Sequence, residues 1–139
     1  MFGTIGVEEI NSLEQFSTYL NKNQNYSSFL AEEFIQGKLY HCDFIIQNGQ
    51  YDFIEVSEYL HNGLSFINGF NHGSILLTQD HPLRSSITEF CKRINIVFGL
   101  KSGCAHFEIF VNEKQELIFL GSRCAPCWLR RSNYVYKYI

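Results

Sequence analysis

The sequence has few of the features that mark a nucleic-acid-binding, membrane or secreted protein. Its 139 residues carry 11 basic and 14 acidic side chains, so the net charge is 11 − 14 = −3. This balance disfavours nucleic-acid binding that rests on bulk electrostatics. No stretch is apolar for long enough to be a signal peptide or to cross a bilayer. We therefore expect a cytoplasmic protein whose partners include neither nucleic acid nor a membrane.

The common nucleotide and hydrolase motifs are missing as well. The sequence contains no G-x-x-x-x-G-K-[ST], no G-x-G-x-x-G and no serine elbow, and its five histidines form no H-x-x-x-H pair. The five cysteines are odd in number, and without an export signal they predict reduced thiols that mostly fill the core.

Cys124 and Cys127 form a C-x-x-C pair that has three interpretations. A zinc half-site would need a second pair of ligands at matching spacing, and only Cys104 and His106 are on offer. A redox dithiol belongs in a βαβ context, which the surrounding sequence does not provide. The third interpretation, incidental cysteines in a turn, is the one we favour.

What is present predicts one compact domain over residues 1–139. The composition is 45% hydrophobic and 16% aromatic, enough to build a core. A capping box at residues 12–15 predicts a short helix over residues 12–20. The other patterns predict a strand (28–35), a long loop (61–73), a short buried strand (74–78) and a helix from Pro82 that ends at Gly99.

A hairpin is predicted around Asn48-Gly49, since both residues tolerate the positive φ of a type I′ turn. The flanking strands cover residues 39–46 and 51–60, and this turn would place Phe44 opposite Phe53. The first strand also carries His41 and Asp43 on one face. They could form a catalytic carboxylate–histidine pair, but alternation predicts a solvated polar face in any case.

A second hairpin is predicted from the strict alternation of residues 105–112, a polar connection at 112–115, and a more fully buried strand at 116–120. His106 and Glu108 share one face of the first strand. A buried charge calls for a partner or a metal, and the alternative is that this face opens to solvent. Together the elements predict an α+β fold, an antiparallel or mixed sheet with helices on one face.

Two stretches then suggest a family. FLAEEFIQGKLYHCDFIIQNGQYDFIEVSEYL (29–60) resembles the middle of an ATP-grasp domain, and GLKSGCAHFEIFVNEKQELIFLGSR (99–123) resembles its metal-binding strands. Residues 3–131 follow the family pattern in order. The resemblance, to the carboxylate–amine ligase and biotin-carboxylase-like superfamily, implies the C-terminal ATP-grasp subdomain. It also implies that the family's N-terminal half, with a lysine strand and a glycine loop over the phosphates, is absent from this chain.

The resemblance also implies roles for particular residues and an ATP- and Mg²⁺-dependent reaction that forms an acyl phosphate, which an amine or thiol attacks. Glu108 matches the first magnesium-binding carboxylate, and Arg123 matches the catalytic arginine that faces phosphate or the substrate carboxylate. Four residues match the strand that contacts the adenine, partly through backbone groups: Glu32, Glu33, Phe34 and Ile35.

The sequence departs from the family pattern in three places. Leu39 stands where the family has a glutamate for the ribose, and Phe119-Leu120-Gly121 replaces the segment with the second metal carboxylate. Cys124 to Cys127 replaces a glycine-rich stretch. We therefore expect weak or vestigial binding of ATP and Mg²⁺, and no ligation by this chain alone.

Three alternatives to a ligase module stay open: a non-catalytic interaction module, a subunit of a split ligase, and, more distantly, a thiol-redox role through Cys124 and Cys127. A half-domain should also expose the apolar surface that its missing half would cover. Large exposed apolar patches usually mark interfaces with a partner. The expected partners are accordingly adenine nucleotide together with a missing N-terminal half or a second copy in a homodimer.

Overall fold

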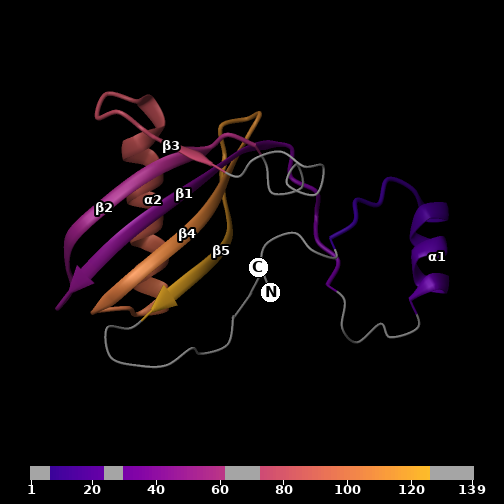
Figure 1. Ribbon diagram of the computed structural model, residues 1–139, viewed down its shortest axis with the longest axis horizontal. Helices are drawn as coiled ribbons and strands as arrows, with labels where there is room; N and C mark the ends of the chain where they lie inside the picture. The colour runs from indigo at the N-terminus through magenta and orange to yellow at the C-terminus, as the bar shows by residue number, and fades with distance from the viewer. Residues whose placement is uncertain (1–6, 24–29, 62–72, 126–139) are drawn as a thin grey trace. The chain divides into compact units, whose positions relative to one another are not determined.

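The computed structural model describes residues 7–23, 30–61 and 73–125 (Figure 1). The chain divides into two compact units, Met1–Ile35 and Gln36–Ile139. Most of the loop predicted over residues 61–73 lies outside the described residues, as does Cys127 of the C-x-x-C pair. Within the described parts, neither helix is long and apolar enough to cross a lipid bilayer.

The first unit contains one described helix, α1 (Leu13–Lys22). Ser12 caps it, since the Ser12 hydroxyl accepts a hydrogen bond from the backbone N–H of Gln15 at 3.1 Å. The Gln15 side chain reaches back to the backbone N–H of Asn11 at 2.7 Å. The capping residues therefore predicted the start of the helix correctly, and the helix continues two residues beyond the predicted end at Leu20.

The strand predicted over residues 28–35 is wrong where the structure describes it, because residues 30–35 have no regular secondary structure. A β-strand is stabilised by a neighbour that pairs with its backbone groups. The strand that follows in the chain, β1 (Gly37–Gln47), is already paired on both sides, with β2 (Gln50–Tyr59) and β4 (Gly103–Asn112). Among the described residues no strand pairs with residues 30–35, and a β-rich composition alone does not make a strand.

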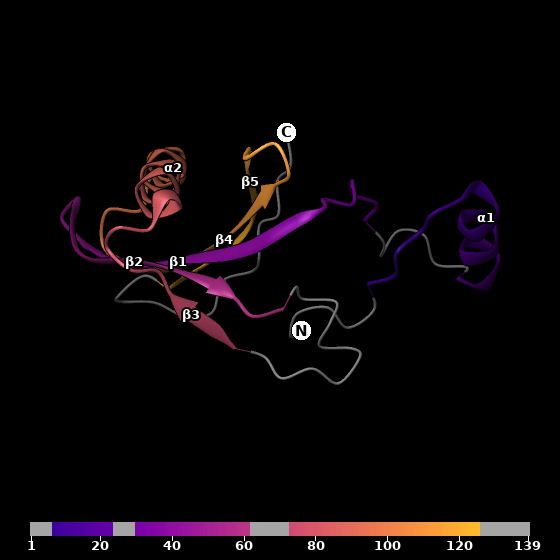
Figure 2. The ribbon, with the colours of Figure 1, turned by 90° about the horizontal axis from the view of Figure 1, so that it is seen from above.

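The second unit is a five-stranded antiparallel sheet in the order β3-β2-β1-β4-β5, with one described helix, α2 (Pro82–Phe98), along one of its faces (Figure 2). The outer strands are β3 (Ser74–Leu76) and β5 (Leu117–Ala125). The predicted α+β class is confirmed.

The core of this unit lies between α2 and the sheet. Alternate residues of the two central strands point towards the helix, where Ile87 and Cys91 are fully buried. The buried set on the strands is Tyr40, Cys42, Phe44 and Ile46 of β1 and Ala105, Phe107, Ile109 and Val111 of β4. Because strand side chains alternate between faces, the intervening polar residues lie on the opposite face. We call this second surface the polar face.

The predicted turn at Asn48-Gly49 is confirmed, with φ values of 52° and 82°. The predicted pairing of Phe44 with Phe53 is wrong, since Phe44 lies opposite Ile54. A β-bulge between Ile45 and Ile46 shifts the register by one residue and leaves Asp52 without a partner.

Two predictions of burial are wrong in part. The segment predicted as a short buried strand at 74–78 contains β3, whose three residues are exposed, whereas Leu77 after the strand is buried in the core. The strand predicted as more fully buried at 116–120 belongs to β5, where residues 117–120 are half-buried. Both strands lie at an edge of the sheet, so each has a neighbouring strand on one side only.

We predict that Gly37→Ala destabilises the second unit by about 1–3 kcal/mol, because the added Cβ would overlap the backbone carbonyl of Val111 across the ladder. Denaturant unfolding followed by circular dichroism measures this. The neighbouring exposed residue supplies the control, Gln36→Ala, expected to change stability by less than about 0.5 kcal/mol. Equal stability of the two variants would contradict the close approach of β1 and β4.

Candidate functional site

The polar face carries a compact group of charged side chains on the two central strands. β1 contributes His41 and Asp43, and β4 contributes His106 and Glu108. In the antiparallel ladder Asp43 lies directly opposite His106, and His41 lies directly opposite Glu108. Imidazoles and carboxylates therefore alternate in a two-by-two array.

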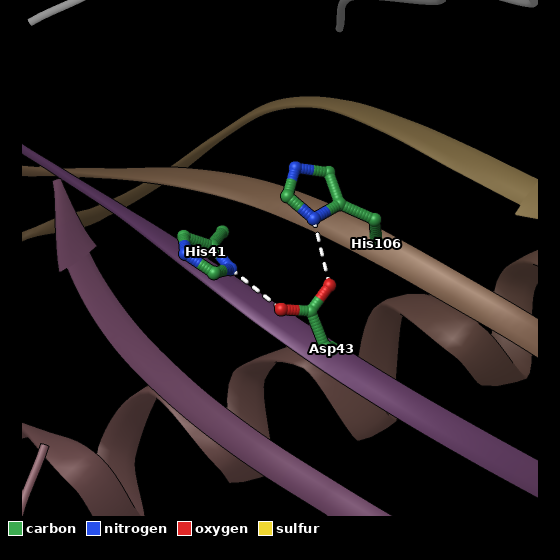
Figure 3. A group of neighbouring side chains, drawn as sticks. All are labelled: His41, Asp43 and His106. Carbon is green, nitrogen blue, oxygen red and sulfur yellow. Dashed lines mark hydrogen bonds and ion pairs between the residues drawn. The ribbon is translucent and has the colours of Figure 1, made fainter. Parts of the chain in front are cut away.

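Asp43 joins the two histidines. Its Oδ2 lies 2.7 Å from His41 Nδ1, and its Oδ1 lies 2.7 Å from His106 Nδ1 (Figure 3). The two imidazole rings have centroids 5.0 Å apart. One carboxylate thus accepts a hydrogen bond from each ring, one on each oxygen.

The second nitrogen of each imidazole also has a partner. His41 Nε2 lies 2.9 Å from Ser74 Oγ on the edge strand β3. His106 Nε2 lies 3.2 Å from the Tyr59 hydroxyl, which donates a hydrogen bond of 3.1 Å to Glu108. A direct His106–Glu108 ion pair of 3.6 Å completes this part of the network. Both rings are held at both nitrogens.

The network shifts the protonation of its members. Hydrogen bonding to Asp43, and then to Glu108, raises the pKa of His106 to about 9. Burial alone would raise the pKa of Asp43, but the hydrogen bonds from His106 and His41 outweigh it and hold that pKa well below its usual range. The His106 contact likewise lowers the pKa of Glu108 despite burial. At neutral pH the array therefore holds two carboxylates around an imidazolium.

Burial of the hydroxyl, together with the charge of Glu108, raises the pKa of Tyr59 above its usual range. The phenol therefore keeps its proton at neutral pH and donates a hydrogen bond to Glu108. Water still reaches the site, since the side chains of Asp43, Glu108 and His106 are 41%, 35% and 29% exposed. His41, at 11%, is the most enclosed.

The site residues predicted from the sequence fall in two places. Arg123 lies on β5 directly opposite His106, so it is on the polar face one strand away from Glu108. The residues matched to adenine contacts belong to the first unit, in a segment without strand structure: Glu32, Glu33, Phe34 and Ile35. Their role in binding adenine stays a prediction.

The positions that depart from the family pattern can also be located. Gly121 lies directly across the ladder from Glu108, and the register of the β4–β5 pairing shifts between Glu108 and Ile109. Leu39 precedes His41 by two residues on β1 and is buried. The polar face therefore has an apolar side chain and a glycine beside its charged array.

The sequence indicates the two pairs, His41 with Asp43 and His106 with Glu108, but does not predict that the two pairs lie in contact. It favoured a solvated face for the first pair, whereas the structure links that pair to His106. Tyr59 and Ser74, which fix the two rings, were missed. The signal available was that both pairs lie on polar strand faces, and only the pairing of β1 with β4 turns this into one site.

The cysteines show a mixed pattern. Cys42 and Cys91 are buried free thiols in the core, as predicted, whereas Cys104 and Cys124 are exposed. Although Cys124 is exposed as a residue, partial desolvation of its sulfur raises the pKa of the thiol, and this disfavours the thiolate that redox chemistry would need.

An antiparallel sheet with one described helix on a face is consistent with a subdomain of the ATP-grasp fold. The sequence matches the model of the ATP-grasp domain over residues 4–127. The chain therefore belongs to the ATP-grasp family.

One characterised relative is the L-arginine-specific L-amino acid ligase of Bacillus subtilis, to which the chain is 32% identical over 98 residues. The alignment covers 68% of this chain and 23% of that ligase, so the chain spans about a quarter of the relative's length.

We predict that His106 titrates near pH 9 in protein kept metal-free with a chelator, and that Asp43→Asn moves the midpoint towards 6.5. NMR of the His106 ring protons measures both midpoints. The pKa of His106 is higher in the folded than in the unfolded protein, so the protonated imidazole stabilises the folded state. This stabilisation is fully present below pH 6.5 and is lost as pH rises through about 9. Asp43 is 41% exposed and partly screened by solvent, so we expect this stabilisation to be about 2 kcal/mol.

A matched control is Asp52→Asn, which changes an exposed carboxylate in the β1–β2 bulge. It should leave the His106 midpoint unchanged. A midpoint near 6.5 in the unmodified protein would contradict the ion pair between Asp43 and His106.

Proposed function

We propose that this chain is an adenine-nucleotide-binding module of the carboxylate–amine ligase type, and that it does not complete ligation by itself. The observation that carries this proposal is the placement of Glu108 and Arg123 on neighbouring strands of the polar face. A carboxylate for a hard cation and a guanidinium for an anion suit a phosphate chain that lies across β4 and β5.

The two residues would have different tasks. Arg123 is a planar cation that can hold a phosphate or carboxylate through paired hydrogen bonds. Glu108 supplies the oxygen ligand that Mg²⁺ prefers. The Tyr59 hydroxyl, hydrogen-bonded to Glu108 at 3.1 Å, fixes the direction in which that carboxylate points.

Glu108 meets only the lower limit of what a nucleotide-bound Mg²⁺ requires. This ion is usually held by one or two protein carboxylates in addition to phosphate oxygens. Gly121, across the ladder from Glu108, contributes no side-chain oxygen. His106, 3.6 Å from the same carboxylate, competes for its charge. The residues therefore fit a weakly held ion.

When bound, Mg²⁺ would neutralise phosphate charge during formation of an acyl phosphate. The chain's own contribution is binding and orientation. Arg123 would position the anionic group. Glu108, fixed on strand β4, would offer its carboxylate to the ion. Glu32 to Ile35 would contact the adenine largely through backbone groups, whose hydrogen bonds do not depend on side-chain identity.

The same observations favour a module without turnover over an active ligase. Phosphoryl transfer depends on positioning and on compensation of charge, and loss of one well-placed group costs on the order of a hundredfold or more in rate. Here Gly121 lies where a second carboxylate is implied by the resemblance, and Leu39 lies where a ribose acceptor is implied. A second candidate function is accordingly a non-catalytic interaction module or a subunit of a split ligase.

We predict that the purified chain releases no ADP above background with Mg-ATP and a pool of amino acids and small carboxylates, but binds Mg-ATP weakly. Amide NMR shifts on β4 and β5 measure the binding. Glu108→Gln should weaken the Mg²⁺-dependent part of the ATP affinity about tenfold or more, because this substitution removes the negative charge and keeps the shape of the side chain.

The control, Glu113→Gln, changes an exposed carboxylate in the β4–β5 connection and should bind like the unmodified chain. ADP release that disappears in Glu108→Gln would overturn the expectation of inactivity and restore the ligase interpretation. No nucleotide-dependent shift at any concentration would instead reject the nucleotide site and favour the interaction module.

A further inference from the structure

The polar face also holds a set of donors that the nucleotide proposal does not use. His41, Asp43 and His106 each offer one ligand atom, and these atoms all lie within 4.8 Å of one another. We propose that these three residues form a binding site for a transition-metal ion, with Zn²⁺ as the ion that the donors suit best.

The donor types select this class of ion. Two imidazole nitrogens with one carboxylate oxygen are a ligand set typical of zinc and its neighbours in the first transition row. Mg²⁺ and Ca²⁺ prefer oxygen ligands and are poorly served by imidazole. The site therefore differs in chemistry, as well as in residues, from a magnesium position at Glu108.

The environment of the two rings is that of metal-binding histidines. Such a histidine binds the ion through one nitrogen and usually donates the other N–H to an oxygen, which fixes the ring. Both Nδ1 atoms here point at Asp43. Both Nε2 atoms point at oxygens: Ser74 Oγ at 2.9 Å for His41, and Tyr59 at 3.2 Å with Glu108 at 3.6 Å for His106.

The scaffold keeps the donors close to the required spacing. Asp43 follows His41 by two residues on β1 and is the direct ladder partner of His106 on β4. Zinc bonds of about 2.0–2.1 Å in a tetrahedron place ligand atoms about 3.3 Å apart. The Asp43 oxygens lie 2.7 Å from each Nδ1. Insertion of an ion thus requires each ring to move about 0.6 Å from the Asp43 oxygen that it now contacts. It also requires ligand atoms that now lie as much as 4.8 Å apart to approach one another.

An ion would take the place of the protons that now lie between Asp43 and the rings. Ser74 can accommodate this exchange, since its hydroxyl can donate to His41 Nε2 or accept from it. On the other side, Glu108 can accept from His106 Nε2–H, which forms the carboxylate–histidine–metal arrangement.

Three protein ligands leave a fourth position of the tetrahedron open, as in zinc sites that bind a water molecule or a substrate oxygen. Asp43 is 41% exposed, so that position is reached from solvent on the polar face. The chemical class of ligand we assign to it is an oxygen donor such as water, a carboxylate or a phosphate.

The test uses the full 139-residue chain, stripped of metal by a chelator and titrated with Zn²⁺ by calorimetry without nucleotide. We expect one equivalent to bind, with shifts of the His41 and His106 ring nitrogens in NMR spectra. His41→Gln should weaken zinc binding at least tenfold. Ser74→Ala, which leaves all three ligands in place, should weaken it by about tenfold, the lower end of the range for loss of a ligand's hydrogen-bond partner.

Two controls separate this site from other zinc ligands. His61→Gln removes a histidine outside the cluster, and Cys124→Ser with Cys127→Ser removes the C-x-x-C thiols; both should bind zinc like the unmodified chain. Circular dichroism confirms that each variant is folded. With Co²⁺ as the probe, the proposed site gives no thiolate charge-transfer absorption.

The proposal is overturned if no zinc binds, if His41→Gln binds zinc as tightly as the unmodified chain, or if binding is lost in the cysteine variant. In the first case Asp43 serves only as the acceptor of an ion pair. Because no nucleotide is present, these outcomes are independent of whether the chain binds ATP.

Discussion

The register of the ladder between β1 and β4 is the constraint on which the rest of the second unit depends. It places Asp43 opposite His106 and His41 opposite Glu108, and on the other face it packs Phe44 edge-to-face against Phe107 under α2. A slip of one residue would move every one of these side chains to the opposite face. Carboxylates would then lie against the helix, where burial of a charge without a partner is costly. The packing of the core therefore also fixes the site.

Given this register, electrostatics explains why the polar face tolerates several half-buried charges. Each carboxylate has an imidazole as its direct partner or close neighbour, and the Tyr59 hydroxyl links His106 to Glu108. Removal of one member would leave a partly buried charge, which costs more than an intact pair contributes. The array is thus mutually dependent, and its rings are held at both nitrogens in a way that isolated surface histidines are not.

Local patterns in the sequence were enough to predict the elements but not their assembly. Alternation identified β4 and its polar residues, Asn48-Gly49 identified the first hairpin, and Pro82 with Gly99 bounded α2, because each signal acts over a few residues. The contact between Asp43 and His106 joins positions 63 residues apart, and alternation carries no information about which strands pair. The register shift between Ile45 and Ile46 was missed as well, because the residues of the turn do not by themselves specify a bulge in the strands beside it.

The polar face is chemically uneven from one side to the other. Towards β5, Glu108 meets Gly121, so the oxygen ligands that a hard cation requires are incomplete there. Towards β1, Glu108 and His106 meet His41 and Asp43, and two imidazoles and one carboxylate offer ligand atoms within 4.8 Å of one another. The two halves share His106, which lies beside Glu108 and also bonds Asp43. A charge added on either side therefore changes the electrostatic environment of the other side through the His106 imidazole. Within a family defined by nucleotide binding, this chain has donors better suited to an ion of the zinc class than to magnesium.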